Sequence, residues 1–279
     1  MSWSSIMATV FLHIPKTGGT TLRHLLYRQY AGKPTYTIDV VKRREGDRRD
    51  LKDTGDFLAL PEREKKRIEL LLGHMNFGLH EELESPVMYF SFIRKPEARV
   101  ISSYDFVMRS EQHPLHAEYK AKYPNIEAFV EDPSQHDVHN RQIRMISGTD
   151  GSEEEMLGKA LDNVEKWFAV VGILERFDDS LLLMQRHFGW TTPWYEIRQK
   201  KKKSDGKKKR SAKLMTMLSE RNRGDLAFYR AMEERLDAQL KEVPSSSLWL
   251  QRKALALSNE YHSSKLGRRA SQFLNSKNT

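Results

Sequence analysis

Residues 8–27 read ATVFLHIPKTGGTTLRHLLY, and this stretch decides the fold. Its first part, 8–14, is rich in β-branched and aromatic residues and stops at Pro15, which predicts a buried strand. From Thr21 to Tyr27, apolar residues recur at i, i+3 and i+4, which predicts a helix with one buried face. A glycine-rich turn joins the two. We therefore expect a strand, turn and helix unit, the building block of an α/β fold.

The turn itself has the chemistry of an anion-binding loop. Free backbone N–H groups and the helix dipole favour an anion at such a position. Gly18 and Gly19 let the backbone approach phosphate oxygens without a Cβ atom in the way. Thr20 and Thr21 add hydroxyl donors, and Lys16 supplies a mobile positive charge. The alternative is a Gly-Gly turn that only connects the strand to the helix.

The order of residues separates this loop from two better-known phosphate loops. A Walker A loop places its lysine after the glycines, whereas Lys16 comes before them. The dinucleotide fingerprint of three spaced glycines is also absent from this turn.

Further strands and helices alternate along the chain. Continuous apolar runs predict strands at 87–93 and 168–173, and 31–60 is expected to form loops with at most a short element. Such strands, separated by helices, indicate one domain over 1–279 with a mostly parallel central sheet flanked by helices and a P-loop-like nucleotide-binding core. Helices are expected at 61–72, 96–108, 126–130, 136–146, 153–167, 174–187, 213–240 and 248–261.

A second possible anchor for an anion follows the strand at 87–93. Arg94 leaves the end of this strand, and Ser102 lies about two helical turns further on. A guanidinium fork and a hydroxyl are a suitable pair for a dianionic phosphate. Considered alone, Arg94 could equally form a surface ion pair.

The first loop resembles the 5′-phosphosulfate loop of sulfotransferases, in the branch that includes the heparan sulfate 2-O- and 6-O-sulfotransferases and many bacterial carbohydrate-type enzymes. Those enzymes carry a closely similar Pro-Lys-Thr-Gly-Gly-Thr-Thr run after their first strand. The resemblance implies transfer of a sulfuryl group from 3′-phosphoadenosine 5′-phosphosulfate to an acceptor hydroxyl, without a metal. It implies that the donor is held by Lys16, Thr17, Gly18, Gly19, Thr20 and Thr21.

The resemblance extends to the second anchor and to a catalytic base. In the family, an arginine and a serine at the spacing of Arg94 and Ser102 hold the 3′-phosphate of the donor, although the usual Asp after the arginine is Lys95 here. Related enzymes place a histidine base between the two anchors, where a neutral imidazole suits the pH. His74 resembles the 2-O-type pattern and is preferred, while His80 resembles the 6-O-type pattern. Lys16 would stabilise charge on the leaving phosphate.

Two further segments match the family. Residues 139–145 match a helix that begins Asn-x-Gln-x-Arg and borders the active site, where Gln142 or Arg144 could equally support a network inside the fold. Residues 170–178 match a strand and turn, which we interpret as mainly structural.

The net charge of +9 comes from one segment. Residues 198–213 carry ten basic residues and one acid, or 10 − 1 = +9, so the rest of the chain sums to zero. This basic loop is interpreted as a solvated insertion, or as a landing site for an anionic nucleotide or polysaccharide. Charge confined to one loop speaks against nucleic-acid binding, the first of three rival functions. The others are a kinase-like phosphoryl transferase and an inactive nucleotide-binding module.

Composition sets the remaining expectations. The sequence contains no cysteine, no apolar run long enough to cross a bilayer and no secretory signal at its start, which predicts a cytoplasmic protein. The tail 263–279 is expected to be frayed. The acceptor could be a sugar or a small metabolite.

Overall fold

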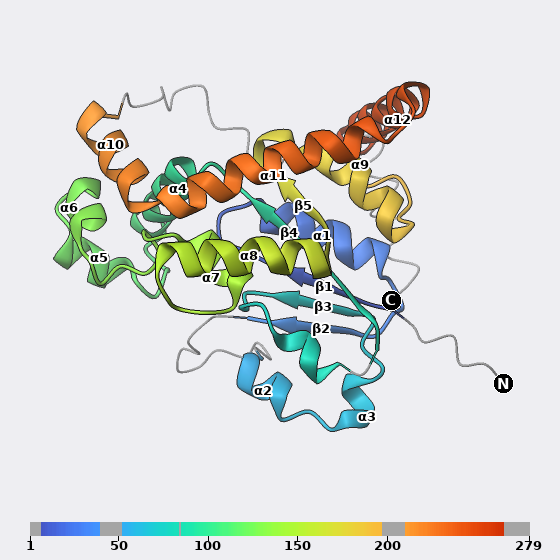
Figure 1. Cartoon of the computed structure of the whole chain (residues 1–279), viewed down its shortest axis with the longest axis horizontal. Helices are drawn as coiled ribbons and strands as arrows, with labels where there is room; N and C mark the ends of the chain where they lie inside the picture. Colours follow the sequence, from blue (N-terminus) through green and yellow to red (C-terminus); the bar gives the residue numbers. More distant parts are fainter. Residues whose placement is uncertain (1–6, 40–51, 84, 197–209, 265–279) are drawn as a thin grey trace.

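Five parallel strands form the centre of the protein, in the order β2-β3-β1-β4-β5 (Figure 1). The structure is a computed structural model that describes residues 7–39, 52–83, 85–196 and 210–264. Every strand pairing in this sheet is parallel. The strands are β1 (Ala8–Leu12), β2 (Thr35–Ile38), β3 (Leu70–Gly73), β4 (Val87–Ile93) and β5 (Phe168–Ile173).

Helices cover both faces of this sheet and extend beyond one end of it. The longer α-helices are α1 (Gly19–Gln29), α4 (Pro96–Arg109), α8 (Glu153–Trp167), α9 (Phe177–Phe188), α10 (Ala212–Arg221), α11 (Arg223–Lys241) and α12 (Ser245–Ser263). The shorter ones are α2 (Thr54–Leu58), α3 (Glu62–Lys65), α5 (His116–Lys122), α6 (Ile126–Glu131) and α7 (Arg141–Ser147). Two 3₁₀ helices are η1 (Leu79–Glu82) and η2 (Leu174–Arg176).

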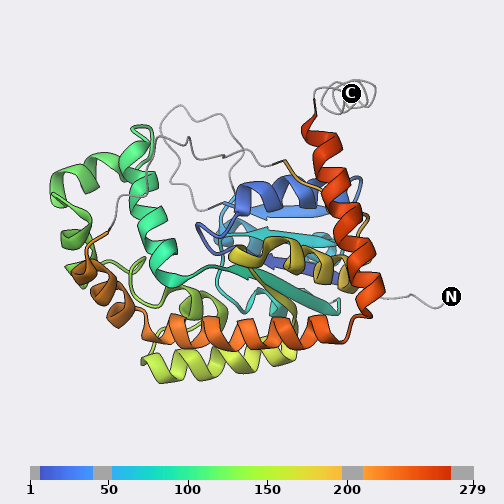
Figure 2. The same ribbon diagram turned by 90° about the horizontal axis from the view of Figure 1, so that it is seen from above.

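The layers explain why the strands are apolar throughout. In Figure 2, α8 and α11 lie along one face of the sheet and α1 lies on the opposite face. All residues of β1, β3 and β5 are buried, as expected for parallel strands covered on both sides. The predicted α/β fold with a parallel sheet and flanking helices is confirmed.

One predicted helix is wrong. The segment 61–72 was expected to be helical up to Gly73, but it contains only the single turn α3, followed by the strand β3. The leucines at 70–72 pair with β1 on one side and β2 on the other, and they are buried on both faces. A short apolar run does not distinguish a buried strand from a buried helix, and here its place inside the sheet decides.

Three smaller differences concern the bounds of elements. The segment 31–60 contains an edge strand, β2, in addition to α2. The helix expected at 136–146 begins only at Arg141, because Asn140 adopts the left-handed conformation with φ 45°. The helix expected at 213–240 is broken at Asn222, whose buried side chain donates to the carbonyl of Leu218 and accepts from the Asn140 amide.

A second hydrophobic core lies beyond the carboxyl ends of the strands, among α4, α5, α6 and α10 (Figure 1). Its aromatic members Tyr104, Tyr119, Tyr123 and Phe129 contact one another with ring centroids 5.2 to 5.4 Å apart. The helix α4 carries residues of this core and begins directly after β4, so it joins the two cores.

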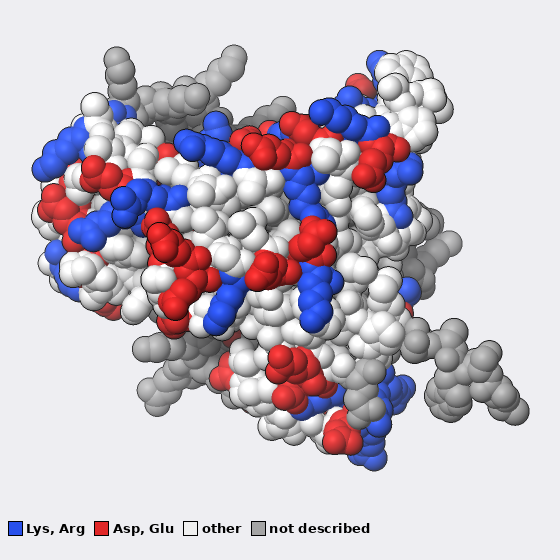
Figure 3. Space-filling model, in the orientation of Figure 1, with Lys and Arg blue, Asp and Glu red and all other residues white. Residues whose placement is uncertain are grey.

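Charges of both signs alternate over α8 and α11 on the face shown in Figure 3. Ion pairs between these two helices join Arg235 to Glu165 at 2.5 Å and Arg223 to Glu153 at 3.8 Å. The basic loop 198–213, except for its last four residues, and the tail 263–279, except for its first two, lie outside the described residues. Within the described part of the chain, no helix has the length and apolar character needed to span a membrane.

Candidate active site

The ends of β1 and β4 define a crevice at the carboxyl edge of the sheet. From β1 the chain continues through α1 to β2 on one side of the sheet, whereas from β4 it continues to β5 on the other side. Ligands of open α/β sheets bind where neighbouring connections diverge in this way. The glycine-rich loop follows β1, Arg94 follows β4, and His74 follows β3, so the fold brings the two anchors and the preferred base to one edge.

The backbone of the loop after β1 requires its glycines. Lys16 has φ 72° and Gly18 has φ 89°, both in the left-handed region. A Cβ atom on Gly19 would lie 1.7 Å from Nε2 of His13, which makes any other residue there incompatible with the buried imidazole. Gly18 is also the N-cap of α1 and provides no side-chain cap, so the first amides of the helix have no partner of that kind. This geometry fits an anion at the start of α1.

The three threonines of the loop differ in what they offer. Thr17 is fully buried, and its hydroxyl donates to the carbonyl of Ile14 at 2.8 Å. Its side chain therefore stabilises the loop, and its backbone N–H is the group that remains suited to bind an anion. Thr20 is exposed and Thr21 is half-buried in the first turn of α1.

Lys16 lies among other cations. Its Nζ atom is 3.7 Å from the centroid of the Phe106 ring on α4. Burial, with the charges of Arg94 and Arg109, lowers the pKa of Lys16 to about 8, while Asp137 acts in the opposite direction. The ammonium group is thus partly buried near two other cations, and an anion bound beside it would favour its charged form.

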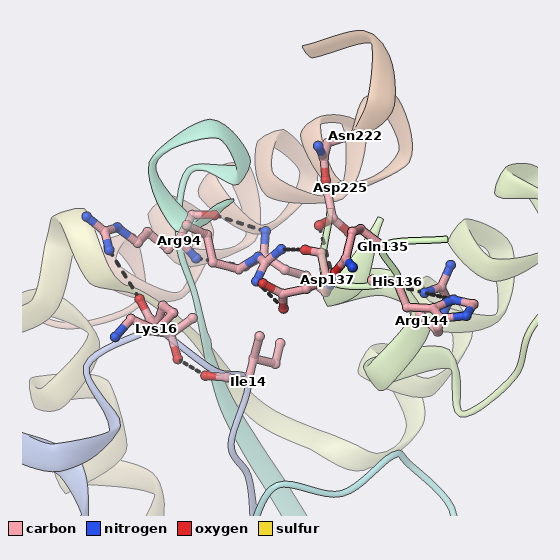
Figure 4. A network of polar contacts seen from close by, with 12 residues as sticks. Ile14, Lys16, Arg94, Gln135, His136, Asp137, Arg144, Asn222 and Asp225 are labelled. Carbon is pink, nitrogen blue, oxygen red and sulfur yellow. Dashed lines mark hydrogen bonds and ion pairs between the residues drawn. The ribbon is translucent and has the colours of Figure 1, made fainter. Parts of the chain in front are cut away.

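Arg94 connects the two anchors. Its Nη1 atom donates to the backbone carbonyl of Lys16 at 3.3 Å, and Figure 4 shows the two residues side by side. Burial lowers the pKa of Arg94, although the charge of Glu175 opposes the effect. Ser102 is half-buried on α4, in the helix that begins just after Arg94. Glu175 accepts from the Lys95 amide at 3.2 Å, so a carboxylate from η2 supports the turn where Lys95 replaces the family's aspartate.

His74 has the tautomer and the protonation state of a base. Its Nδ1 atom lies 2.8 Å from the carbonyl oxygen of His13. A carbonyl oxygen can only accept, so Nδ1 carries the proton and Nε2 keeps its lone pair. Burial lowers the pKa of His74, which favours the neutral ring. The ring stacks on that of His13, with centroids 4.1 Å apart, and is held rigidly.

His80 lies away from this edge of the sheet. Its Nδ1 atom and its amide both lie 3.1 Å from the hydroxyl of Tyr89, and its ring lies 4.1 Å from that of Trp167. Trp167 directly precedes β5, and Tyr89 lies roughly 13 Å before the end of β4. The structure therefore brings His74, and not His80, to the edge that carries the loop.

Three site residues were missed by the sequence reasoning. His13 is buried between the rings of Phe11 and His74 and provides the carbonyl that orients the base. Arg23 and Arg141 are cations close enough to lower the pKa of His74, and Arg23 also pairs with Asp39 at 3.2 Å. Arg23 lies one turn into α1, and Arg141 lies within the matched segment 139–145 at the start of α7, so position in or next to a motif was the available signal.

The matched segments take part in polar networks inside the fold. Gln142 is fully buried and bonds the backbone of Arg94, which makes it part of a network inside the fold. Arg144 pairs with Asp150 at 2.9 Å. Residues 170–178 form the end of β5, η2 and the start of α9.

The fold and the site define an α/β protein with a glycine-rich loop after β1 and a basic residue, Arg94, after β4, where the connections of its strands diverge. Residues 4–264 match the galactose-3-O-sulfotransferase family, and the chain belongs to it. Human galactose-3-O-sulfotransferase 2 is 25% identical over 199 residues, which cover 65% of this chain and 48% of the human protein. The chain thus spans about half the length of this curated relative.

Among solved structures, mouse sulfotransferase SULT7A1 complexed with PAP is similar, with 16% identity, 68% of this chain and 66% of that chain covered, and a TM-score of 0.37. Membership of this family confirms the predicted resemblance to a sulfotransferase family. The family that matches is the galactose-3-O type, so the narrower prediction of a heparan sulfate 2-O- or 6-O-type branch is not confirmed.

Proposed function

We propose that this sulfotransferase moves a sulfuryl group from 3′-phosphoadenosine 5′-phosphosulfate to a hydroxyl of a carbohydrate, with His74 as the base. One observation carries the proposal: a neutral histidine with an unprotonated Nε2 lies at the same sheet edge as the glycine-rich loop and Arg94. The family supports sulfuryl transfer. The donor and the base are our inference from the residues.

The residues at this edge fit such a donor. The uncapped start of α1 and the lowered pKa of Lys16 both favour an anion after β1. The loop 16–21 would hold the 5′ side of the nucleotide, while Arg94 and Ser102 would hold the 3′-phosphate. When bound, the donor supplies an activated sulfuryl group whose leaving group is a phosphate.

The chain's own residues then have separate tasks. His74 accepts the proton of the acceptor hydroxyl at Nε2, and the His13 carbonyl keeps the ring oriented as it becomes charged. Lys16 and the loop amides stabilise negative charge that grows on the leaving oxygen. Arg141 adds positive charge near His74, which keeps the ring neutral before the reaction and favours an anionic group beside it.

The acceptor is proposed from the family name and from charge. Galactose-3-O-sulfotransferase homology favours a hydroxyl of a galactose-containing glycan over a small metabolite. The heparan-type branch would instead predict an anionic polysaccharide. Arg23 and Arg141 next to the base are compatible with acidic groups on either glycan.

The test is calorimetric titration with 3′-phosphoadenosine 5′-phosphate, with ATP and Mg²⁺ as the control. We expect micromolar binding of the 3′-phosphorylated nucleotide, loss of this binding in Arg94→Ala, and weak binding of ATP. A preference for ATP with Mg²⁺ would contradict the proposal and favour a kinase-like phosphoryl transferase. Radiolabelled sulfate transfer to galactosides and to heparan sulfate would then distinguish the two acceptors.

A further inference from the structure

The buried side chain of Gln142 bonds to the backbone of Arg94, the second of the two proposed phosphate anchors. The side chain of Gln142 accepts from the Arg94 amide at 2.9 Å and donates to the Arg94 carbonyl at 3.0 Å. The backbone N–H and C=O of Arg94 therefore both bond to the carboxamide of Gln142, as they would to a neighbouring strand. Gln142 is fully buried, so neither bond competes with water.

The contact lies where the sheet no longer supports the chain. β4 ends at Ile93, so Arg94 is the first residue beyond its pairing with β5. Its guanidinium then reaches back to the Lys16 carbonyl at 3.3 Å. Lys16 has a left-handed backbone, a conformation that is unfavourable for a non-glycine residue and needs support from its surroundings. A shift of Arg94 would therefore move both anchors.

Gln142 is itself fixed from the opposite side. Its amide and that of Ile143 donate to the carboxylate of Asp225 on α11, at 3.1 and 2.8 Å. The amide of Asp225 donates in turn to the side chain of Asn140 at 3.0 Å. Asp225 is fully buried, and Figure 4 shows it together with Arg94 and Lys16 in one continuous network. The start of α7 is thus locked to α11.

We propose that Gln142 is a positioning residue that sets both phosphate anchors, by holding the Arg94 backbone so that the Arg94 guanidinium can hold the loop at Lys16. This proposal deepens the proposed function and rests on it for the identity of the ligand. The competing role is purely structural: Gln142 would only satisfy two buried groups, with no effect on the loop.

Gln142→Met is the principal variant, because it keeps the length of the side chain and removes both bonds to Arg94. Asn163→Leu is the matched control. Asn163 on α8 donates to the carbonyls of Ile146 and Ser147, at 3.0 and 3.2 Å, at the other end of α7. Each variant removes two hydrogen bonds from the same short helix, but only the first reaches Arg94.

The first readout is binding of 3′-phosphoadenosine 5′-phosphate compared with adenosine 5′-phosphate, which lacks the 3′-phosphate. In Gln142→Met we expect the preference for the 3′-phosphorylated nucleotide to fall about tenfold, the effect of one weakened charge-assisted bond. The preference should be unchanged in Asn163→Leu. An unchanged preference in a folded Gln142→Met protein would overturn the proposal.

The second readout needs no nucleotide. Hydrogen exchange of the Arg94 amide and of the loop amides at 16–19 should accelerate in Gln142→Met and not in Asn163→Leu. Gln142→Glu keeps the acceptor for the Arg94 amide and loses the donor to the Arg94 carbonyl. It should therefore protect that amide from exchange and still weaken the preference for the 3′-phosphorylated nucleotide. Slow loop exchange in both Gln142 variants would assign the residue a structural role only.

These two readouts separate the proposals. If the wild-type protein does not prefer the 3′-phosphorylated nucleotide, the proposed function fails, and loop exchange alone decides the positioning role. If the wild type shows the preference and Gln142→Met retains it, the positioning role fails and the proposed function stands.

Discussion

At the scale of single residues, the charge states of His74 and Lys16 set the pH range of the site. The pKa of His74 is lowered from 6.5, so the ring stays neutral to below that pH. The pKa of Lys16 is lowered to about 8, so its positive charge is lost as the pH rises through about 8. Base and cation are therefore both in their useful form between these limits.

We expect kcat/KM to form a plateau at neutral pH and to fall on both sides. The acidic limb should lie below 6.5 because His74 becomes protonated, and the basic limb near 8 because Lys16 loses its proton. Lys16→Arg, which stays charged, should move the basic limb to higher pH even if the rate is reduced. Transfer rates measured over the pH range in both proteins test this, and an unmoved basic limb would exclude Lys16 as its source.

The two histidines should respond differently to the same change. His74→Gln should lower kcat by about 10² to 10⁴, the usual contribution of a general base. His80→Gln should leave kcat within a few-fold, because His80 lies beside Tyr89 and Trp167, away from the edge that carries the loop. Single-turnover transfer assays with both variants measure the effect on the chemical step. A larger loss of rate in His80→Gln than in His74→Gln would reverse the assignment of the base.

At the scale of elements, two glycine positions give opposite expectations. Gly19→Ala places a methyl group 1.7 Å from the His13 ring, so it should unfold the loop and abolish nucleotide binding. Gly158 lies exposed in α8 with nothing within 4 Å of its ideal Cβ position. Gly158→Ala should stabilise the protein by about 0.5 to 1 kcal/mol. Urea unfolding and calorimetric titration of both variants provide the test, and normal binding by Gly19→Ala would contradict the described loop.

Sequence reasoning predicted the elements whose patterns are local. The strands β4 and β5 and the helix α8 have the expected bounds; α8 also begins with a capping box between Ser152 and Glu155. The prediction from sequence failed at β3, because three consecutive leucines are compatible with a helix or a strand. Their burial between β1 and β2 is a tertiary property. The break at Asn222 was equally hidden, since it depends on a contact with Asn140 far away in the sequence.

The candidate site divides in the same way. The loop 16–21 and Arg94 were predicted from motifs that follow strands, and His74 was predicted from the family resemblance; the structure brings all of them to one edge. The orienting carbonyl of His13 and the charge of Arg141 come from contacts between separate segments. Spacing along the chain carries no information about such contacts.

At the scale of the whole molecule, buried neutral histidines link folding to pH. The pKa values of His13 and His74 are lowered by burial in the folded protein, and that of Asp225 is raised by burial. A histidine of this kind leaves the folded state with fewer bound protons than the unfolded state. The contribution of such a buried neutral ring to the free energy of unfolding is complete above the unfolded pKa of about 6.5. This contribution is lost as the pH falls below that value.

We therefore expect the free energy of unfolding to fall between pH 6.5 and pH 5, by roughly 1.4 kcal/mol per pH unit for each full proton of difference. The raised pKa of Asp225 acts in the opposite sense and reduces the slope. Urea unfolding at several pH values measures it, and His74→Gln should flatten the dependence. A stability that is constant or rises towards pH 5 would contradict the burial of these rings in their neutral form.

The close approach of His13 to Gly19 has a consequence for how this loop can change over evolutionary time. The imidazole occupies the volume that any side chain at position 19 would need, so the two positions exclude each other. A lineage that enlarges residue 19 first passes through a protein with a broken loop. One that shrinks residue 13 first passes through a protein with a cavity next to His74. Substitution at this pair therefore has a preferred order, with position 13 changing before position 19.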